Sequence, residues 1–266
     1  MPGISILKSN FSQSENSVSD NEHVQDEILS CALDTVMHDD RYIQNILLRK
    51  KSFWVACTKY PEYPISIHED EHFWVCVEGK IYGQADTDIK REINALLIEV
   101  SKSGERSEQR GGVNRWLSIT DGEFVIYALN KESNEFFIIN DILGRLPLYY
   151  YGDDMRLIIS RELSFVSYLL WNDIDIRNIE NKENKFLFDR MAIAQYLLFG
   201  YPLDKRTLIS DIYRMQPGTL GRISNGKCDK FEDGIPSGTC FNIENLYSFD
   251  VGQKKIRRRQ SKRQYR

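Results

Sequence analysis

The sequence has no long apolar run, no C-x-x-C pair and no basic start followed by an apolar segment, and each absence removes a class of protein. A helix that crosses a membrane needs roughly 18 apolar residues in a row. A secretory signal peptide needs a basic segment before its apolar core, and residues 1–17 show neither. Five cysteines at wide spacings indicate reduced thiols rather than a disulfide framework, so we expect a cytoplasmic protein: Cys31, Cys57, Cys76, Cys228 and Cys240.

Charge is distributed unevenly along the 266 residues, although the net charge is only −4. Residues 253–266 hold eight Lys or Arg and no acid, which leaves 27 basic against 39 acidic residues, or −12, for the rest. A basic end of this kind could bind RNA, DNA or another anionic surface. It could equally be a disordered tail, or mark an abnormal end of the reading frame before a further domain. The sequence does not separate these three hypotheses.

The apolar pattern predicts helices and antiparallel strands in separate blocks. Helical spacing of apolar residues predicts helices at 27–37, 86–100 and 191–198. Short runs rich in Val, Ile and aromatic residues predict strands at 52–57, 72–77, 116–119, 124–128, 135–139, 149–151 and 156–160. The polar stretches 9–26 and 102–112 are predicted to be loops. This order indicates an α+β protein, because a Rossmann sheet would alternate strands and helices regularly.

Six stretches of the sequence carry recognisable motifs: MPGIS at the start, EGKIYG at 78–83, ITDGEFVIYALN at 119–130, NDILGRLPLYYY at 140–151, ISRELSFV at 159–166 and AIAQYLLFGYPLDKRTLISDIYRMQPGTLGRI at 192–223. In this order they resemble landmarks of the class II glutamine amidotransferase domain of the asparagine synthetase family. The corresponding sequence motifs of the family include M-C-G-I, N-G-E-I-Y-N, L-D-G-x-F-A-F, D-x-x-G-x-x-P-L-Y-Y and A-S-E-x-K-A-L. Each motif alone is weak, but six in the right order over about 220 residues are specific.

The resemblance implies a fold and a division of the chain. The fold is an α+β, N-terminal-nucleophile (Ntn) hydrolase-type four-layer sandwich, in which two stacked antiparallel sheets lie between helical layers. We expect a glutaminase-like domain at 1–200, a connector towards a synthetase domain at 201–237, and a basic, disordered tail at 238–266. The turn through Asp141 and the tyrosine strand at 149–151 would then be scaffold, with that strand central in its sheet.

At the positions that the resemblance assigns to the substrate pocket, this sequence carries residues that differ from those of the family. Pro2 stands where the nucleophilic cysteine follows the initiator methionine, and without a thiol the thioester intermediate cannot form. Glu78 stands at the asparagine that donates to the oxyanion, and a carboxylate offers no donor, whereas the adjacent Gly79 is retained. Lys59 and Asp86 are the nearest counterparts of the arginine and the acidic clamp that hold the substrate. We therefore expect a degenerate domain without glutaminase activity.

Family members also carry an ATP-binding S-G-G-x-D-S loop in a second domain, and SGTC at 237–240 matches only its first letters. We therefore expect no cofactor and no catalytic residue in this chain. The expected role is a scaffold or regulator for a synthetase-type domain on another chain, or a homodimer.

Two further enzyme hypotheses rest on short motifs. HEDEH at 68–72 fits the H-E-x-x-H zinc motif, which needs a helix to bring both histidines to one face. Pro64 before the motif and FWVCV after it favour a solvated hairpin loop and no metal. Pro2, once the methionine is removed, would expose a secondary amine that could act as a base, as in the tautomerase family. No other feature of that family accompanies it.

Overall fold

The computed structural model describes residues 2–9, 18–50, 52–102, 106–153, 156–171, 188–224 and 240–245. The helices of these residues are α1 (Val18–Asp34), α2 (Asp86–Ser101), α3 (Arg106–Ile119), α4 (Leu163–Trp171) and α5 (Arg190–Phe199). The strands are β1 (Gly3–Ser9), β2 (Ile43–Lys50), β3 (Phe53–Lys59), β4 (Ile65–Glu69), β5 (Phe73–Ile81), β6 (Gly122–Asn130), β7 (Phe136–Asn140), β8 (Tyr149–Gly152), β9 (Arg156–Ser160), β10 (Tyr213–Arg214), β11 (Thr219–Ser224) and β12 (Cys240–Asn245). None of the described helices has both the length and the apolar character to cross a membrane.

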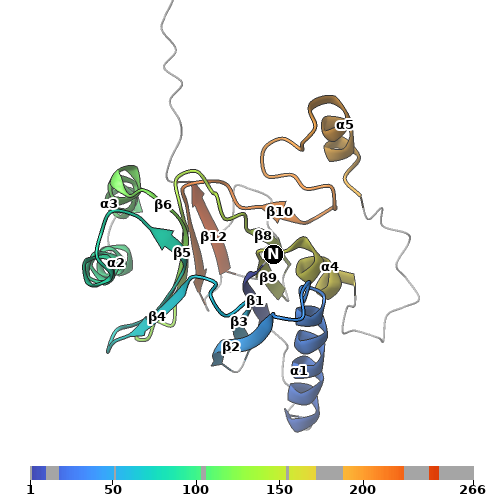
Figure 1. The fold of residues 1–266 in the computed structure, drawn as a ribbon, viewed down its shortest axis with the longest axis horizontal. Helices are drawn as coiled ribbons and strands as arrows, with labels where there is room; N and C mark the ends of the chain where they lie inside the picture. The colour runs from blue at the N-terminus through green and yellow to red at the C-terminus, as the bar shows by residue number, and fades with distance from the viewer. Residues whose placement is uncertain are drawn as a thin grey trace, which may run out of the picture.

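The strands form two stacked, six-stranded sheets. The first has the order β10-β8-β9-β1-β3-β2 and the second β12-β11-β7-β6-β5-β4. Neighbouring strands are antiparallel throughout. Helices α1 and α4 cover the outer face of the first sheet, and α2 and α3 cover that of the second (Figure 1). The α+β four-layer sandwich expected from the sequence is confirmed.

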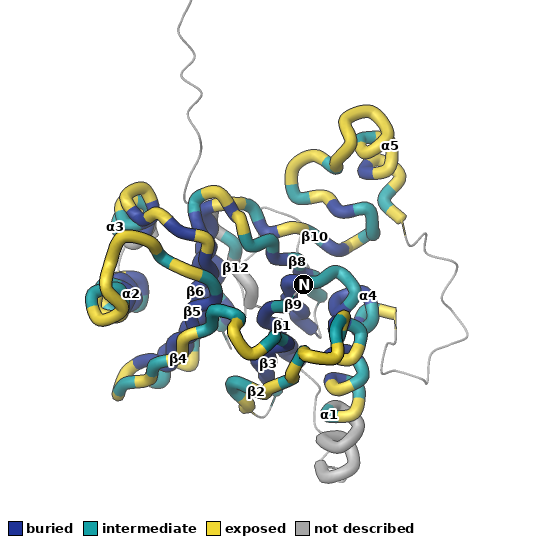
Figure 2. The backbone as a smooth tube through the Cα atoms, in the orientation of Figure 1, coloured by how far each residue is buried: buried dark blue, intermediate teal, exposed yellow. Residues whose placement is uncertain are grey.

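Alternation of side chains along the strands divides the core into three layers. Ile4 and Ile6 of β1 join a cluster between the sheets that also holds Tyr127 and Phe136. Leu7 points the other way, into the cluster beneath α1 and α4. A third cluster fixes α2 and α3 on the second sheet. Figure 2 shows the result: the inner strands are buried, whereas much of the edge strands β2 and β4 and the turns between strands are exposed.

Two loop predictions and one strand prediction were wrong. Helix α1 begins at Val18, inside the predicted loop 9–26. Helix α3 replaces the predicted loop 102–112 and the predicted strand 116–119, and it packs against α2. Val113 and Leu117, four residues apart, are buried on one face of α3. The predicted strand was a misreading of the dense apolar end of this helix.

The sheets extend beyond residue 200, which differs from the expected division of the chain. Strand β10 pairs with β8, β11 pairs with β7, and β12 pairs with β11. Residues 240–245, inside the predicted tail at 238–266, form strand β12 and complete the edge of the second sheet. Residues 246–266, with the basic run, lie outside the described residues. Where the domain ends stays a prediction.

The turn before the tyrosine strand fastens two segments of the scaffold together. The carboxylate of Asp141 accepts the backbone N–H groups of Leu143 at 2.9 Å and Arg145 at 3.1 Å. The Asp141 carbonyl accepts those of Gly144 and Gly218, each at 3.0 Å. Strand β8 lies second from one edge of its sheet, between β9 and the two-residue strand β10. It is therefore not the central strand that the sequence predicted.

Candidate functional site

The beginning of β1 and the end of β3 bring the first two predicted site residues together. Gly3 pairs with Thr58 in antiparallel register, so Pro2 lies beside Lys59 one step further along. Both residues are half-buried. The Lys59 Nζ lies 3.5 Å from the carbonyl oxygen of Pro61. The chain thus places a proline and a cation side by side at this edge of the sandwich.

Glu78, in β5 of the other sheet, is fully buried beneath the N-terminal strand. Its Oε1 accepts hydrogen bonds from the Tyr63 hydroxyl at 2.6 Å and from Arg161 Nε at 3.1 Å, and its Oε2 accepts one from the Tyr127 hydroxyl at 3.0 Å. A Cβ placed on Gly3 would lie 3.0 Å from Glu78 Oε1. We call these four side chains, Glu78, Tyr63, Tyr127 and Arg161, the Glu78 network.

Arg161, which sequence reasoning missed, completes this network from the end of β9. Its Nη1 donates to the carbonyl of Pro147 at 2.8 Å, and its backbone N–H donates to the carbonyl of Ile4 at 3.3 Å. A Cβ on Gly3 would lie only 2.2 Å from Arg161 Cγ, so the arginine stem occupies the space next to the strand. One signal could have found it. In ISRELSFV, Arg161 stands at the glutamate of A-S-E-x-K-A-L, a charge reversal that accompanies the acid at position 78.

The electrostatics of the Glu78 network keep its donors protonated. Burial opposes the charge on Arg161, but attraction to Glu78 acts the other way and the pKa of Arg161 is raised. Burial, and then the negative Glu78, raises the pKa of both Tyr63 and Tyr127. A buried ion pair is tolerated when its remaining atoms are hydrogen-bonded, as they are here. The network therefore presents a carboxylate whose oxygens already accept three hydrogen bonds and which offers no donor.

The backbone conformation directly after Glu78 requires a glycine at position 79. Its φ is +93°, and a Cβ there would lie 2.0 Å from the carbonyl oxygen of Glu123. Its N–H donates to the carbonyl of Pro64 at 2.8 Å. This N–H is therefore engaged within the fold, like the oxygens of Glu78.

Asp86 lies at the first turn of α2, where it is exposed and where a negative charge suits the helix dipole. Among the described residues, it makes no hydrogen bond or ion pair with Pro2, Lys59 or the Glu78 network. The structure thus brings Pro2, Lys59, Glu78 and Gly79 to one edge of the sandwich and does not join Asp86 to them.

Two cysteines lie between the sheets near this edge. Cys57 of β3 and Cys76 of β5 are fully buried. Burial raises the pKa of both thiols, and the nearby Glu78 adds to the effect. A reactive cysteine needs an accessible thiolate. Neither thiol is therefore suited to act as a nucleophile.

The HEDEH run spans the end of β4 and the turn that leads to β5, so it lies on a hairpin as expected, although its first two residues belong to the strand. His68 is in β4, opposite Val75, and His72 is in the turn. His68 Nε2 lies 3.4 Å from Asn94 Oδ1. Within the described part of the chain, no three His, Cys, Asp or Glu side chains gather as a set of metal ligands.

Comparison with known proteins agrees with the family expected from the sequence motifs. Residues 55–232 match the family model of the glutamine amidotransferase domain. Over 160 residues the chain is 24% identical to asparagine synthetase [glutamine-hydrolyzing] 1 of Bacillus subtilis, covering 59% of this chain and 23% of that protein. Over 77 residues it is 30% identical to a tRNA (guanine-N(1)-)-methyltransferase of Saccharopolyspora erythraea, covering 29% of each. The chain thus spans less than a third of the length of either curated relative.

Among solved structures, the chain is similar to the glutamine phosphoribosylpyrophosphate amidotransferase from B. subtilis. The two share 10% identity and superpose with a TM-score of 0.43, over 92% of this chain and 49% of the other. Together, the family match and the two stacked antiparallel sheets confirm the Ntn-hydrolase-type fold class.

Proposed function

This chain belongs to the glutamine amidotransferase domain family, and we propose that it has the scaffold of that domain without its glutaminase activity. The Glu78 network carries the proposal. Where the resemblance places an oxyanion donor, a buried carboxylate accepts hydrogen bonds from Tyr63, Tyr127 and Arg161. Stabilising a developing oxyanion needs donors aimed at it, and a carboxylate adds repulsion instead.

The missing nucleophile supports the same proposal. Amide hydrolysis in this family begins with attack by a cysteine thiol, and Pro2 has none. Arg161 fills the space against Gly3, so the side chain of a substrate would have to displace part of a buried ion pair to reach this strand. Displacing one partner of such a pair leaves the other as an uncompensated buried charge.

We further propose that the domain acts in the cytoplasm as a scaffold for an ATP-dependent, amide-forming synthetase-type domain. Two observations support this role. The asparagine synthetase relative is much longer than the matched region, which covers 23% of it. The segment that would lead towards such a domain is built into both sheets through β10 and β11. Movements of a bound partner would therefore be transmitted to the sandwich itself.

The test is reconstitution with the synthetase-type domain of a related asparagine synthetase, supplied as a separate polypeptide. We expect a stable complex that forms an amide from ammonia and the carboxylate substrate of the synthetase-type domain, with ATP activating the carboxylate, and no product when glutamine is the only nitrogen source. The matched control is the synthetase-type domain alone, which gives the ammonia-dependent rate without the scaffold. Absence of a complex would contradict the scaffold role, and glutamine-dependent product would contradict the loss of glutaminase activity.

A further inference from the structure

Helix α5 and the loops beside it expose a large apolar surface. Nine large apolar side chains are 37–78% exposed here: Phe188, Met191, Ile193, Tyr196, Leu197, Leu198, Phe199, Tyr201 and Leu203. At about 200 Å² for a large side chain, such fractions leave on the order of 1,000 Å² open. The largest apolar patch on a typical monomer is about 300–600 Å². Figure 2 shows this exposed segment standing away from the sandwich.

The outward side of α5 is mainly apolar, with one arginine. Ala192 is the one residue of this helix that is buried. At about 100° per residue, the side centred opposite Ala192 carries six residues that we call the α5 face: Arg190, Met191, Ile193, Ala194, Leu197 and Leu198. Leu197 and Leu198 are 78% and 76% exposed. A helix of a globular protein normally buries an apolar stripe of this width.

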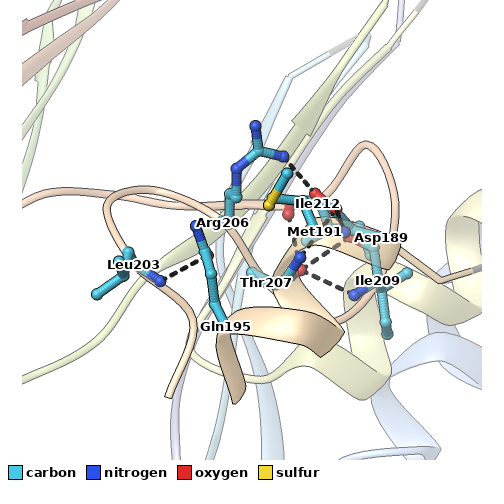
Figure 3. A network of polar contacts seen from close by, with 9 residues as sticks. Asp189, Met191, Gln195, Leu203, Arg206, Thr207, Ile209 and Ile212 are labelled. Atoms are coloured by element: carbon cyan, nitrogen blue, oxygen red, sulfur yellow. Dashed lines mark hydrogen bonds and ion pairs between the residues drawn. The ribbon is translucent and has the colours of Figure 1, made fainter. Parts of the chain in front are cut away.

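Polar contacts hold the α5 face in a defined position. Asp189 caps the helix by accepting the N–H groups of Met191 at 2.9 Å and Ala192 at 3.0 Å, and its other oxygen accepts from Arg206 at 2.6 Å. The network continues to Thr207, whose hydroxyl contacts carbonyls of the following loop (Figure 3). A surface already held in its binding conformation loses less entropy when it associates.

The charges of α5 favour a second, antiparallel copy of the same helix. Arg190 lies on the α5 face in the first turn, where the helix dipole disfavours a cation, and the last turn has no basic residue. In an antiparallel pair, the Arg190 of each copy lies against the C-terminal end of the other helix, where the dipole favours a cation. A parallel pair would instead bring two arginines together.

We propose that the α5 face is the interface of a two-fold symmetric homodimer in which two α5 helices pack antiparallel. The four large apolar side chains of the α5 face leave roughly 500 Å² open by the same estimate, which is the size of a weak, reversible interface of less than about 600 Å² per partner. A two-fold axis near Ala194 makes the same patch contact itself, as an isologous dimer requires. The α5 face shares no residue with the Glu78 network, so this proposal does not rest on the fate of the glutaminase site.

Sedimentation velocity of the full chain between about 1 and 100 μM tests the proposal. We expect a reversible monomer–dimer equilibrium whose dissociation constant rises at least ~100-fold in Leu197→Glu/Leu198→Glu. Both leucines are exposed in the monomer, so the variant should fold. Arg190→Glu should raise the constant about 10-fold, although the acid suits the helix N-terminus of the monomer. The matched control is Ile119→Glu, at a side chain 79% exposed on α3, which should leave the equilibrium unchanged.

Cross-linking tests the antiparallel geometry. Ala194→Cys should form an intermolecular disulfide near the two-fold axis, whereas Ala95→Cys, an exposed alanine on α2, should add none to the wild-type background. A wild type that stays monomeric at the highest concentration would overturn the proposal. A dimer that persists in Leu197→Glu/Leu198→Glu would overturn it too. So would a monomer that uses the α5 face only to bind a synthetase-type domain.

Discussion

Arg161 Nε lies 3.1 Å from Glu78 Oε1, and the two side chains are 4% and 0% exposed. Glu78 belongs to one sheet and Arg161 follows the last residue of a strand in the other. This ion pair therefore ties the two sheets together beneath the N-terminal strand. By the motif resemblance, Glu78 stands where the family has an asparagine and Arg161 where it has a glutamate.

The costs of removing Glu78 and Arg161 should not be additive. Glu78→Gln and Arg161→Met should each lower the free energy of unfolding by about 3–5 kcal/mol, because each leaves the other group buried without its partner. The double variant should lose clearly less than the sum, since the amide oxygen of Gln can still accept from Tyr63 and Tyr127. Urea unfolding of the four proteins gives the coupling energy. Additive losses would show that the two side chains do not act as a pair.

The backbone at Gly79 should tolerate no side chain. Gly79→Ala should lower the free energy of unfolding by at least about 3 kcal/mol, because strain at φ +93° adds to the clash with the Glu123 carbonyl. Gly83→Ala is the matched control. Its φ is +77° but nothing lies within 4 Å of its Cβ, so it should cost only about 1–2 kcal/mol. Equal losses at the two sites would refute the close contact at Gly79.

Part of the acid sensitivity of the fold should come from His68. Burial lowers the pKa of His68 below its ordinary 6.5, while the contact with Asn94 acts in the opposite direction. The unfolded chain then binds a proton more readily than the folded one, so stability is full above pH 6.5 and falls as the pH drops below it. His68→Gln should reduce the difference in stability between pH 7 and pH 5. An unchanged difference, measured by urea unfolding, would exclude this role.

The cap of α5 should control the local stability of that helix. Asp189→Ala removes the acceptor for two backbone N–H groups and the partner of Arg206, and it should cost about 1–2 kcal/mol. Asp189→Asn keeps an accepting oxygen and should cost less. Hydrogen exchange of the α5 amides measures both. Exchange in Asp189→Ala as slow as in the wild type would argue against a capping role.

The sandwich was predictable where the sequence carried an ordered set of family motifs, and the errors arose where local patterns compete with tertiary packing. The dense apolar end of α3 resembled a strand, because periodicity over four residues cannot separate the two states. Strand β12 was taken for part of the tail, since the sequence alone does not show that an edge of the second sheet is open beside β11. The three hypotheses for the basic run at 253–266 stay untested.

The candidate site was only partly visible in the sequence. The motifs pointed to Pro2, Glu78 and Gly79 because each of these residues lies within a short segment that resembles a family motif. Arg161 lies 83 positions from Glu78, so nothing local indicated that the two side chains meet. Lys59 was assigned to the pocket only because of its position in the sequence. The register of β1 with β3 puts it beside Pro2.

The most direct test of the central claim is ammonia release from glutamine by the wild type, Pro2→Cys and Pro2→Cys/Glu78→Asn. We expect none from the wild type, and none from Pro2→Cys, which gains a thiol and, after removal of the methionine, its α-amine base. Loss of one oxyanion donor alone costs about 10²–10³ in rate, and Glu78 adds repulsion. Any activity should appear only in the double variant. Turnover by the single variant would show that Glu78 is not the degenerate oxyanion residue, and clear turnover by the wild type would contradict the account as a whole.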